Sequence, residues 1–527
     1  MCGVIAILLA DGEKQCCADL VDGLTTLQHR GQDAAGLVTA CTKAHWASVK
    51  FRMHKDMGLV RDVFSQPERV RGLSGNVGIA HVRYPTSGDG GTQECQPFYV
   101  NFPCGLALAH NGNLTNDEAL RRELVGTHRH LNTDSDSEVL LNVFAEELNK
   151  MLEQRTRGSV SAAGAPLSAK IEPDSIFTAV KGVMRRCRGG YAVVMLIHNV
   201  GVVAFRDPWG IRPLVFGTKA SATIPGGVDL AVASESVALD TLGYALCRDV
   251  APGEALLIMP FDAAQPKKCQ HEAMICHDSP RLVPCIFEYV YFSRPDSMMN
   301  GVSVYEAQLK MGEKLAAKFL KFYGAGLNVD VVIAVPDTSR PIALQCAYSL
   351  GKPYREGFIK NRYVGRTFIM PGQENRRKGV RMKLNTIRSE FRGKDVLLID
   401  DSIVRGTTST ELVLMAREAG ARTVYFVSAS PEVRHPNVYG INISNSSELI
   451  AHNRTPESIA KMLGADGVLF QDLCDLEEAI RQLNPTQLGP FESSVFNGEY
   501  VTDEEPNSPH VSPAPTERAP SALAIAA

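Results

Sequence analysis

The chain reads Asp395-Val396-Leu397-Leu398-Ile399-Asp400-Asp401-Ser402-Ile403-Val404-Arg405-Gly406-Thr407-Thr408-Ser409, and this stretch decides the fold of its second half. A run of apolar residues ends in two carboxylates and a turn rich in glycine and hydroxyl groups. Residues 409–419 then have a helical pattern that stops at Gly420, and apolar strands are predicted at 330–337 and 423–428. Apolar strands alternating with helices predict an α/β domain with a buried parallel sheet, whose ligands bind at the carboxyl ends of the strands.

The turn after this strand has the chemistry of an anion site. Its amides, its hydroxyl groups and the start of the next helix suit a phosphate. Asp400 and Asp401 can bind a ribose diol, or a Mg2+ ion that in turn holds pyrophosphate. A capped turn beside a buried acidic pair is the alternative. The chain has neither a G-x-x-x-x-G-K-[ST] loop nor a G-x-G-x-x-G motif, which argues against a Walker site and a dinucleotide fold.

Residues 360–383 form a basic segment with eight Lys or Arg residues and one acidic residue, Glu374. Such a run can be a solvated face or a nucleic-acid patch. We expect a lid over an anionic leaving group, because Gly365 and Gly372 offer hinges and a closed lid would exclude water.

The first 250 residues predict a different architecture. Short β-type runs at 77–81, 105–110, 193–197, 201–205 and 230–234 are bounded by Gly, Asn and Asp, and a helix with one apolar face is predicted at 138–152. This arrangement indicates a layered α+β domain.

Cys2 directly follows the initiator methionine. If Met1 is removed, one residue carries a thiol and a free α-amine, whose pKa of about 7.7–8.0 suits a base for its own side chain. A small apolar residue in a first strand is the alternative reading.

Four polar segments, at 29–36, 81–86, 110–116 and 135–138, lie at or just after predicted strand ends. Asn111 and Gly112 can supply an amide and an N–H for an oxyanion hole. Arg83 fits a carboxylate, and Asp136 fits an ammonium group. Together these groups match a free amino acid, although each alone could be turn chemistry or a surface ion pair.

Behind Cys2-Gly3, these segments resemble the glutaminase domain of class II glutamine amidotransferases, which have the αββα fold of N-terminal-nucleophile hydrolases. The resemblance implies that Cys2 is the nucleophile and that Asn111 and the Gly112 N–H form the oxyanion hole. Arg83 and Asp136 would hold the α-carboxylate and α-amino group of glutamine. Two further residues match positions that order the site when it closes, namely Arg30 and Tyr84.

The stretch at 395–409 resembles the phosphoribosyl pyrophosphate (PRPP) signature of type I phosphoribosyltransferases. The resemblance implies that Asp400 and Asp401 contact the ribose hydroxyls, and that the loop holds the 5′-phosphate through Arg405, Gly406, Thr407, Thr408 and Ser409. Residues 335–341 match the pyrophosphate loop, with Ser339 at the metal-associated position, so Ser339, Asp400 and Asp401 are the implied Mg2+ site. Lys360, at the start of the basic segment, is also expected to bind PRPP.

With residues 287–297, the two signatures resemble the amidophosphoribosyltransferase family over about residues 1–500. The resemblance implies transfer of ammonia from glutamine to PRPP, giving 5-phosphoribosylamine, glutamate and pyrophosphate at the first step of purine biosynthesis. It also implies inhibition by purine nucleotides and a homo-oligomer, either a dimer or a tetramer. A different class II amidotransferase would not explain Asp400 and Asp401. A binding module that only senses PRPP or nucleotides would be expected to have damaged catalytic positions.

No iron–sulfur cluster is expected. Some family members carry a propeptide and a cluster, whereas here only Met1 precedes Cys2. The positions that match the cluster ligands hold Cys285, Asn437, Glu492 and Val495, and a cluster needs about four cysteine ligands.

Composition sets the remaining expectations. The 527 residues are 44% hydrophobic with a net charge of −3, which predicts a globular protein and argues against general nucleic-acid or membrane binding. Thirteen scattered cysteines indicate a reducing compartment, and we expect the cytoplasm. The predicted organisation is a glutamine amidotransferase domain at 2–250 with a surface insertion at 156–166, a phosphoribosyltransferase domain with flanking elements at 251–500, and a disordered tail at 501–527.

Overall fold

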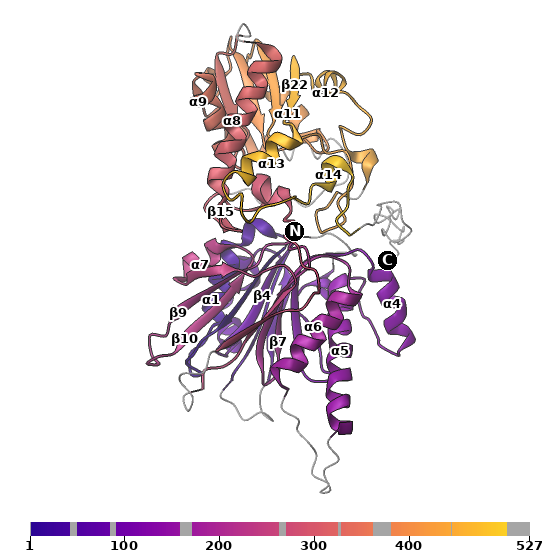
Figure 1. Ribbon diagram of the computed structural model, residues 1–527. Helices are drawn as coiled ribbons and strands as arrows, with labels where there is room; N and C mark the ends of the chain where they lie inside the picture. Colours follow the sequence, from indigo (N-terminus) through magenta and orange to yellow (C-terminus); the bar gives the residue numbers. More distant parts are fainter. Residues whose placement is uncertain are drawn as a thin grey trace, which may run out of the picture.

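The computed structural model describes residues 2–42, 50–84, 91–158, 171–262, 270–324, 328–361, 381–443 and 445–502. Figure 1 shows two halves joined end to end, the first in indigo to magenta and the second in rose through orange to yellow. Residues 503–527 of the predicted tail, 159–166 of the predicted insertion and 362–380 of the basic segment lie outside the described residues.

Two antiparallel sheets form the centre of the first half. The seven-stranded sheet has the order β11 (Ala245–Asp249), β9 (Val215–Ala220), β10 (Val228–Ala233), β1 (Gly3–Leu8), β4 (Val77–Arg83), β2 (Ala34–Ala40) and β3 (Arg52–Met57). The six-stranded sheet has the order β13 (His271–Ile275), β12 (Glu254–Ile258), β8 (Gly201–Arg206), β7 (Gly189–Ile197), β6 (Leu106–Leu114) and β5 (Phe98–Val100).

The alternation of side chains along β1 explains the layers. Ile5 and Ile7 face one way and join an apolar cluster with the helices α1 (Cys17–Thr26), α2 (Val60–Val63), α3 (Pro67–Gly72) and α7 (Ser236–Leu242). Val4, Ala6 and Leu8 face the other way and pack against the second sheet. That sheet is covered on its outer face by α4 (Asp117–Gly126), α5 (Asp136–Gly158) and α6 (Pro173–Arg186). The predicted αββα architecture is therefore confirmed (Figure 1).

The antiparallel layers extend further along the chain than expected. β12 pairs with β8, and β13 pairs with β12, so residues 254–275 continue the six-stranded sheet. A domain boundary at residue 250 would separate β12, and β13 with it, from β8, the strand with which β12 pairs. By strand pairing, the first half extends to Ile275.

The second half contains the predicted parallel sheet, in the order β17 (Tyr354–Arg355), β16 (Val331–Ala334), β20 (Asp395–Asp400), β21 (Thr423–Ser428) and β22 (Gly467–Phe470). One face packs on α8 (Val304–Tyr323), α9 (Arg340–Leu350) and α13 (Leu473–Arg481). The other face packs on α11 (Thr407–Glu418) and α12 (Pro456–Leu463). Shorter elements are β14 (Met298–Met299) with β15 (Val302–Ser303), β18 (Phe358–Lys360) with β19 (Leu384–Thr386), and α14 (Ser494–Asn497).

Helix α11 begins two residues before its predicted start and ends one residue before its predicted end. Gly406 precedes it with a φ of +76°, and Gly420 follows it with a φ of +97°, a conformation that favours glycine. Because β16 and β20 are adjacent and parallel, the loops after them meet at one edge of the sheet.

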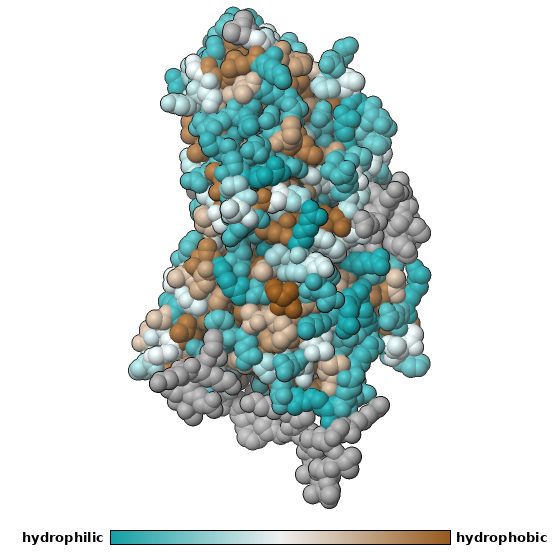
Figure 2. Space-filling view, in the orientation of Figure 1, coloured by the Kyte–Doolittle hydropathy of each residue, from teal (hydrophilic) through white to brown (hydrophobic). Residues whose placement is uncertain are grey.

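Hydrophilic residues predominate on the face in Figure 2, and hydrophobic residues form small separate groups there. Among the described residues, no helix combines the length and apolar character that crossing a bilayer requires.

Candidate active sites

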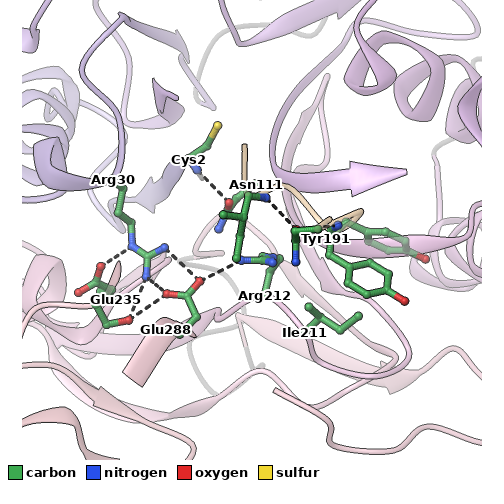
Figure 3. Close-up of polar contacts among 12 residues, drawn as sticks. Cys2, Arg30, Asn111, Tyr191, Ile211, Arg212, Glu235 and Glu288 are labelled. Carbon is green, nitrogen blue, oxygen red and sulfur yellow. Dashed lines mark hydrogen bonds and ion pairs between the residues drawn. The ribbon is translucent and has the colours of Figure 1, made fainter. Parts of the chain in front are cut away.

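Cys2 lies just before β1, in the middle of the seven-stranded sheet, and only 7% of its surface is exposed. Its backbone nitrogen donates a 3.0 Å hydrogen bond to Oδ1 of Asn111, which belongs to the second sheet. Its Sγ lies 3.7 Å from the carbonyl oxygen of Tyr84. The structure therefore brings together three of the predicted residues from β1, β6 and the end of β4, as Figure 3 shows for Cys2 and Asn111.

Asn111 presents an unsatisfied donor beside Cys2. The side chain is fully buried, its Oδ1 accepts from Cys2, and its Nδ2 has no hydrogen-bond partner in the described part of the chain. Leaving such a group unpaired costs about 1–3 kcal/mol, so it indicates a ligand acceptor. Gly112 follows with a φ of +145°, and a Cβ there would lie 2.0 Å from the Gly190 oxygen. Only glycine fits this position.

Arg83 and Asp136, predicted to bind the two ends of glutamine, flank the same region. Arg83 ends β4 and forms a buried ion pair with Glu94. Asp136 begins α5, and its Oδ2 accepts a 2.9 Å hydrogen bond from the Leu114 N–H, three residues after Asn111. Their assignment to glutamine stays a prediction.

Two buried histidines lie in the predicted polar segments but have no predicted role. Burial, followed by the nearby Arg83 cation, holds the pKa of His81 well below its usual value. Burial also lowers the pKa of His110, although Asp136 opposes the shift; His110 Nδ1 lies 3.0 Å from Ser137 Oγ. Both rings are therefore neutral at pH 7.

Arg30 has a different setting from the other predicted glutamine-site residues. Its guanidinium is fully buried and pairs with Glu235 of the first half and Glu288 of the second, the latter at 2.7 Å (Figure 3). Arg212 adds a 3.4 Å contact to Glu288. Burial alone would raise the pKa of Glu235, but Arg30 and then His29 hold it below its usual range. Arg30 thus joins the two halves, and its role in ordering the glutamine site stays a prediction.

The second site lies where β16 and β20 end. Asp400 and Asp401 are buried, and the Asp401 N–H donates a 2.9 Å hydrogen bond to Oδ1 of Asp400. Hydroxyl groups of Ser402 and Thr338 donate to Asp401. Burial raises the pKa of both carboxyls, and repulsion from Asp401 raises that of Asp400 further. A cation would relieve this repulsion.

Ser339, the residue predicted at the metal-associated position, does not contact the aspartate pair as Thr338 does. Its hydroxyl is fully buried and donates to the carbonyl oxygens of Val335, at 2.5 Å, and Ile399, at 2.9 Å. It thereby ties the loop after β16 to β20, while the neighbouring Thr338 reaches Asp401. The metal role of Ser339 stays a prediction.

The predicted phosphate loop leads into α11. Thr407, Thr408 and Ser409 form its first turn, where free amides and the positive end of the helix dipole favour an anion. At the rim, Lys360 pairs with Asp337 at 3.0 Å, and Arg405 pairs with Glu448 at 2.6 Å. Both pairs are at least 42% exposed, so they can exchange for substrate at little cost.

The donor set at Asp400 and Asp401 suits Mg2+, which proteins often hold with one or two carboxylates plus substrate phosphates. Within the described ranges, no group of three or more His, Cys, Asp or Glu side chains could hold a metal ion by itself. Substrate oxygens and water would complete the coordination of a bound Mg2+ ion.

Comparison with known proteins finds relatives over nearly the whole chain. A family model for a glutamine amidotransferase domain matches residues 81–166. The chain is 52% identical over 507 residues to an amidophosphoribosyltransferase of Pseudomonas aeruginosa, covering 96% of this chain and 93% of that protein. It is 48% identical over 511 residues to one of Saccharomyces cerevisiae, with the same coverage. A solved glutamine PRPP amidotransferase from B. subtilis, complexed with ADP and GMP, has a TM-score of 0.77 and 35% identity, covering 95% of this chain and 97% of that one.

Proposed function

The chain belongs to the amidophosphoribosyltransferase family, and on that premise we propose which residues carry out its reaction. The enzyme transfers ammonia from glutamine to PRPP, giving 5-phosphoribosylamine, glutamate and pyrophosphate, at the first step of purine biosynthesis. The observation that carries the residue assignment is the buried, unpartnered Nδ2 of Asn111, whose Oδ1 holds the Cys2 nitrogen at 3.0 Å.

In the glutaminase half, the free α-amine of Cys2 takes the thiol proton and Sγ attacks the side-chain carbonyl carbon of glutamine. The carbonyl oxygen becomes an oxyanion, which Asn111 Nδ2 and the Gly112 N–H stabilise. The C–N bond then breaks, ammonia leaves with the proton, and water hydrolyses the thioester to glutamate. Arg83 binds the α-carboxylate of glutamine, and Asp136 binds its α-ammonium group. Tyr84, whose carbonyl oxygen lies 3.7 Å from Cys2 Sγ, and Arg30 order the site when it closes.

In the phosphoribosyltransferase half, ammonia attacks C1 of the ribose as the bond to pyrophosphate breaks. Asp400 and Asp401 orient the ribose hydroxyls, while the loop at 405–409 binds the 5′-phosphate. Ser339 and Lys360 are assigned to the pyrophosphate side. When bound, Mg2+ supplies positive charge that neutralises the departing pyrophosphate.

Pyrophosphate release from PRPP, measured separately with glutamine and with ammonium chloride, tests these assignments. Cys2→Ala should abolish the glutamine-driven rate and leave the ammonium-driven rate intact, because only the first needs the thiol. Asp401→Asn should lower both rates. If Cys2→Ala lowered both rates equally or changed neither, the two-site assignment would be wrong. Mass spectrometry should detect a chain without Met1, since retained Met1 would remove the proposed base.

We also propose a cytoplasmic location, supported by the twelve described cysteines, all of which are free. Inhibition by purine nucleotides is supported by the B. subtilis relative solved with ADP and GMP and by a second solved relative, described as the allosteric regulatory enzyme of purine biosynthesis. A homo-oligomer remains our proposal from the family resemblance, and light scattering would test it.

A further inference from the structure

We propose that residues 437–441, which belong to the phosphoribosyltransferase half, form a positioning element for the oxyanion hole of the glutaminase half. We call them the seating segment. The proposal rests on the assigned role of Gly112 and adds a structural requirement: the oxyanion hole holds its geometry only when the second half packs on it.

The closest approach joins two glycines from opposite halves. A Cβ on Gly440 would lie 2.9 Å from both the carbonyl carbon and the carbonyl oxygen of Gly112. Carbon atoms in ordinary contact are about 3.5–4.0 Å apart, so Gly440 touches the oxyanion strand with no room for a methyl group. Gly440 also has a φ of +103°, which favours glycine independently of the contact.

Two neighbouring contacts hold the seating segment in register with β6 and β7. Asn113 Nδ2 donates a 3.0 Å hydrogen bond to the carbonyl oxygen of Val438, across 325 residues of sequence. On the adjacent strand, a Cβ on Gly190 would lie 3.2 Å from the Tyr439 Cβ. Asn113 and Gly190 are paired across β6 and β7, and Gly112 is the neighbour of Asn113, so these two contacts lie next to the contact between Gly440 and Gly112.

The seating segment is itself rigidly held. Oδ1 of Asn437 accepts hydrogen bonds of 2.9 Å from the N–H groups of both Tyr439 and Ile441. The fully buried Tyr439 hydroxyl lies 3.0 Å from both the backbone nitrogen and the hydroxyl of Thr502. Tyr500 anchors the preceding residue by donating to the Pro436 carbonyl oxygen at 2.8 Å. A segment fixed in this way can transmit a displacement of the second half to Gly112.

The consequence is specific to glutamine chemistry. Oxyanion donors act only within about 2.7–3.1 Å of the developing charge, so a shift of several tenths of an ångström at Gly112 weakens transition-state stabilisation. Substrate binding depends less on these donors, and the ammonium-driven reaction bypasses them. Disturbing the seating segment should therefore lower kcat with glutamine more than it changes KM.

The test compares Gly440→Ala with Gly464→Ala in the full-length enzyme. Gly464 also has positive φ, at +73°, but a Cβ there meets nothing within 4 Å. We expect Gly440→Ala to lower the glutamine-driven kcat ~10-fold or more, with KM for glutamine within ~3-fold and the ammonium-driven rate within ~2-fold. Gly464→Ala should leave both rates within ~2-fold, because it adds backbone strain without the contact.

A second variant covers the case in which Gly440→Ala does not fold. Asn113→Ala adds no atoms and removes only the hydrogen bonds of its amide, including the one to Val438; it should lower the glutamine-driven kcat ~3-fold and spare the ammonium-driven rate. Folded variants that keep the full glutamine rate, or that lose both rates equally, would overturn the proposal. Wild-type release of pyrophosphate with ammonium tests the proposed function separately, whatever these variants do.

Discussion

Replacing Asn111 by aspartate separates the two functions of this side chain. The change is nearly isosteric and keeps an oxygen to accept from the Cys2 nitrogen, where Oδ1 now lies at 3.0 Å. It replaces the unpartnered Nδ2 donor by a second carboxylate oxygen. The nucleophile should therefore stay in place while the oxyanion hole loses a donor and gains a negative charge.

The expected loss has two parts. Removing one oxyanion donor lowers kcat about 10²–10³-fold, or about 2.7–4 kcal/mol. A negative charge about 4 Å from the oxyanion adds up to about 4 kcal/mol of repulsion at an effective dielectric constant of 20. The carboxylate also favours the protonated α-amine of Cys2, which removes the base. We expect a loss of at least ~10²-fold in the glutamine-driven rate.

Glutamate release and pyrophosphate release should be measured together, with glutamine and then with ammonium. Asn116→Asp is the matched control, because Asn116 binds the backbone at Arg186 and Arg188, away from Cys2. That control should keep the glutamine-driven rate near that of the wild type. An Asn111→Asp enzyme within ~10-fold of the wild-type glutamine rate would refute the assignment of Nδ2 to the oxyanion. Equal loss with ammonium would instead indicate general misfolding.

Three further outcomes are expected. Arg30→Met should destabilise the fold by about 3–5 kcal/mol, because it leaves Glu235 and Glu288 buried with fewer partners. The control Arg71→Met breaks an exposed ion pair with Glu68 and should cost under about 1 kcal/mol. Similar denaturation midpoints for the two variants would contradict this expectation. Because burial holds the pKa of His81 well below its usual value, its contribution to stability should be present above pH ~6.5 and fall by at most about 1.4 kcal/mol by pH 5.5. His81→Asn should flatten that slope in urea titrations, and an unchanged slope would exclude His81 as its source. Chelating Mg2+ should stop pyrophosphate release with either ammonia donor, and adding it back should restore release; turnover that persists in chelator would count against the role assigned to Asp400 and Asp401.

Many of the strands and helices could be predicted from the local order of apolar and polar residues. The apolar run at 395–400, its two carboxylates and the helix that begins at Thr407 are all encoded within about 25 consecutive residues. The predicted strands in the first half lie within β4, β6, β7, β8 and β10 to within a residue. Period-two and helical patterns report local conformation and burial, so they locate such elements without knowledge of their partners.

The predicted boundary at residue 250 shows where local pattern fails. β12 and β13 look like ordinary short strands, and only their pairing to β8 assigns them to the first half. Similarly, nothing near Ser339 indicates that its hydroxyl is used by two backbone carbonyl groups while Thr338 reaches Asp401. Pairing partners and side-chain direction depend on which layers pack together, and that information is distributed over the whole chain.

By itself, the sequence indicated the two chemistries and the groups we assign to them: Cys2 with Asn111 and Gly112, and Asp400 with Asp401. Only the tertiary structure decided where the two halves touch each other. The contact of Gly440 with Gly112 and the Arg30 bridge to Glu288 join residues more than 250 positions apart. No sequence periodicity extends over that separation. These contacts form because the two halves, each folded from its own local pattern, bury a common surface. The close packing there requires glycine at position 440, and the burial there requires that the Arg30 and Glu288 charges be paired.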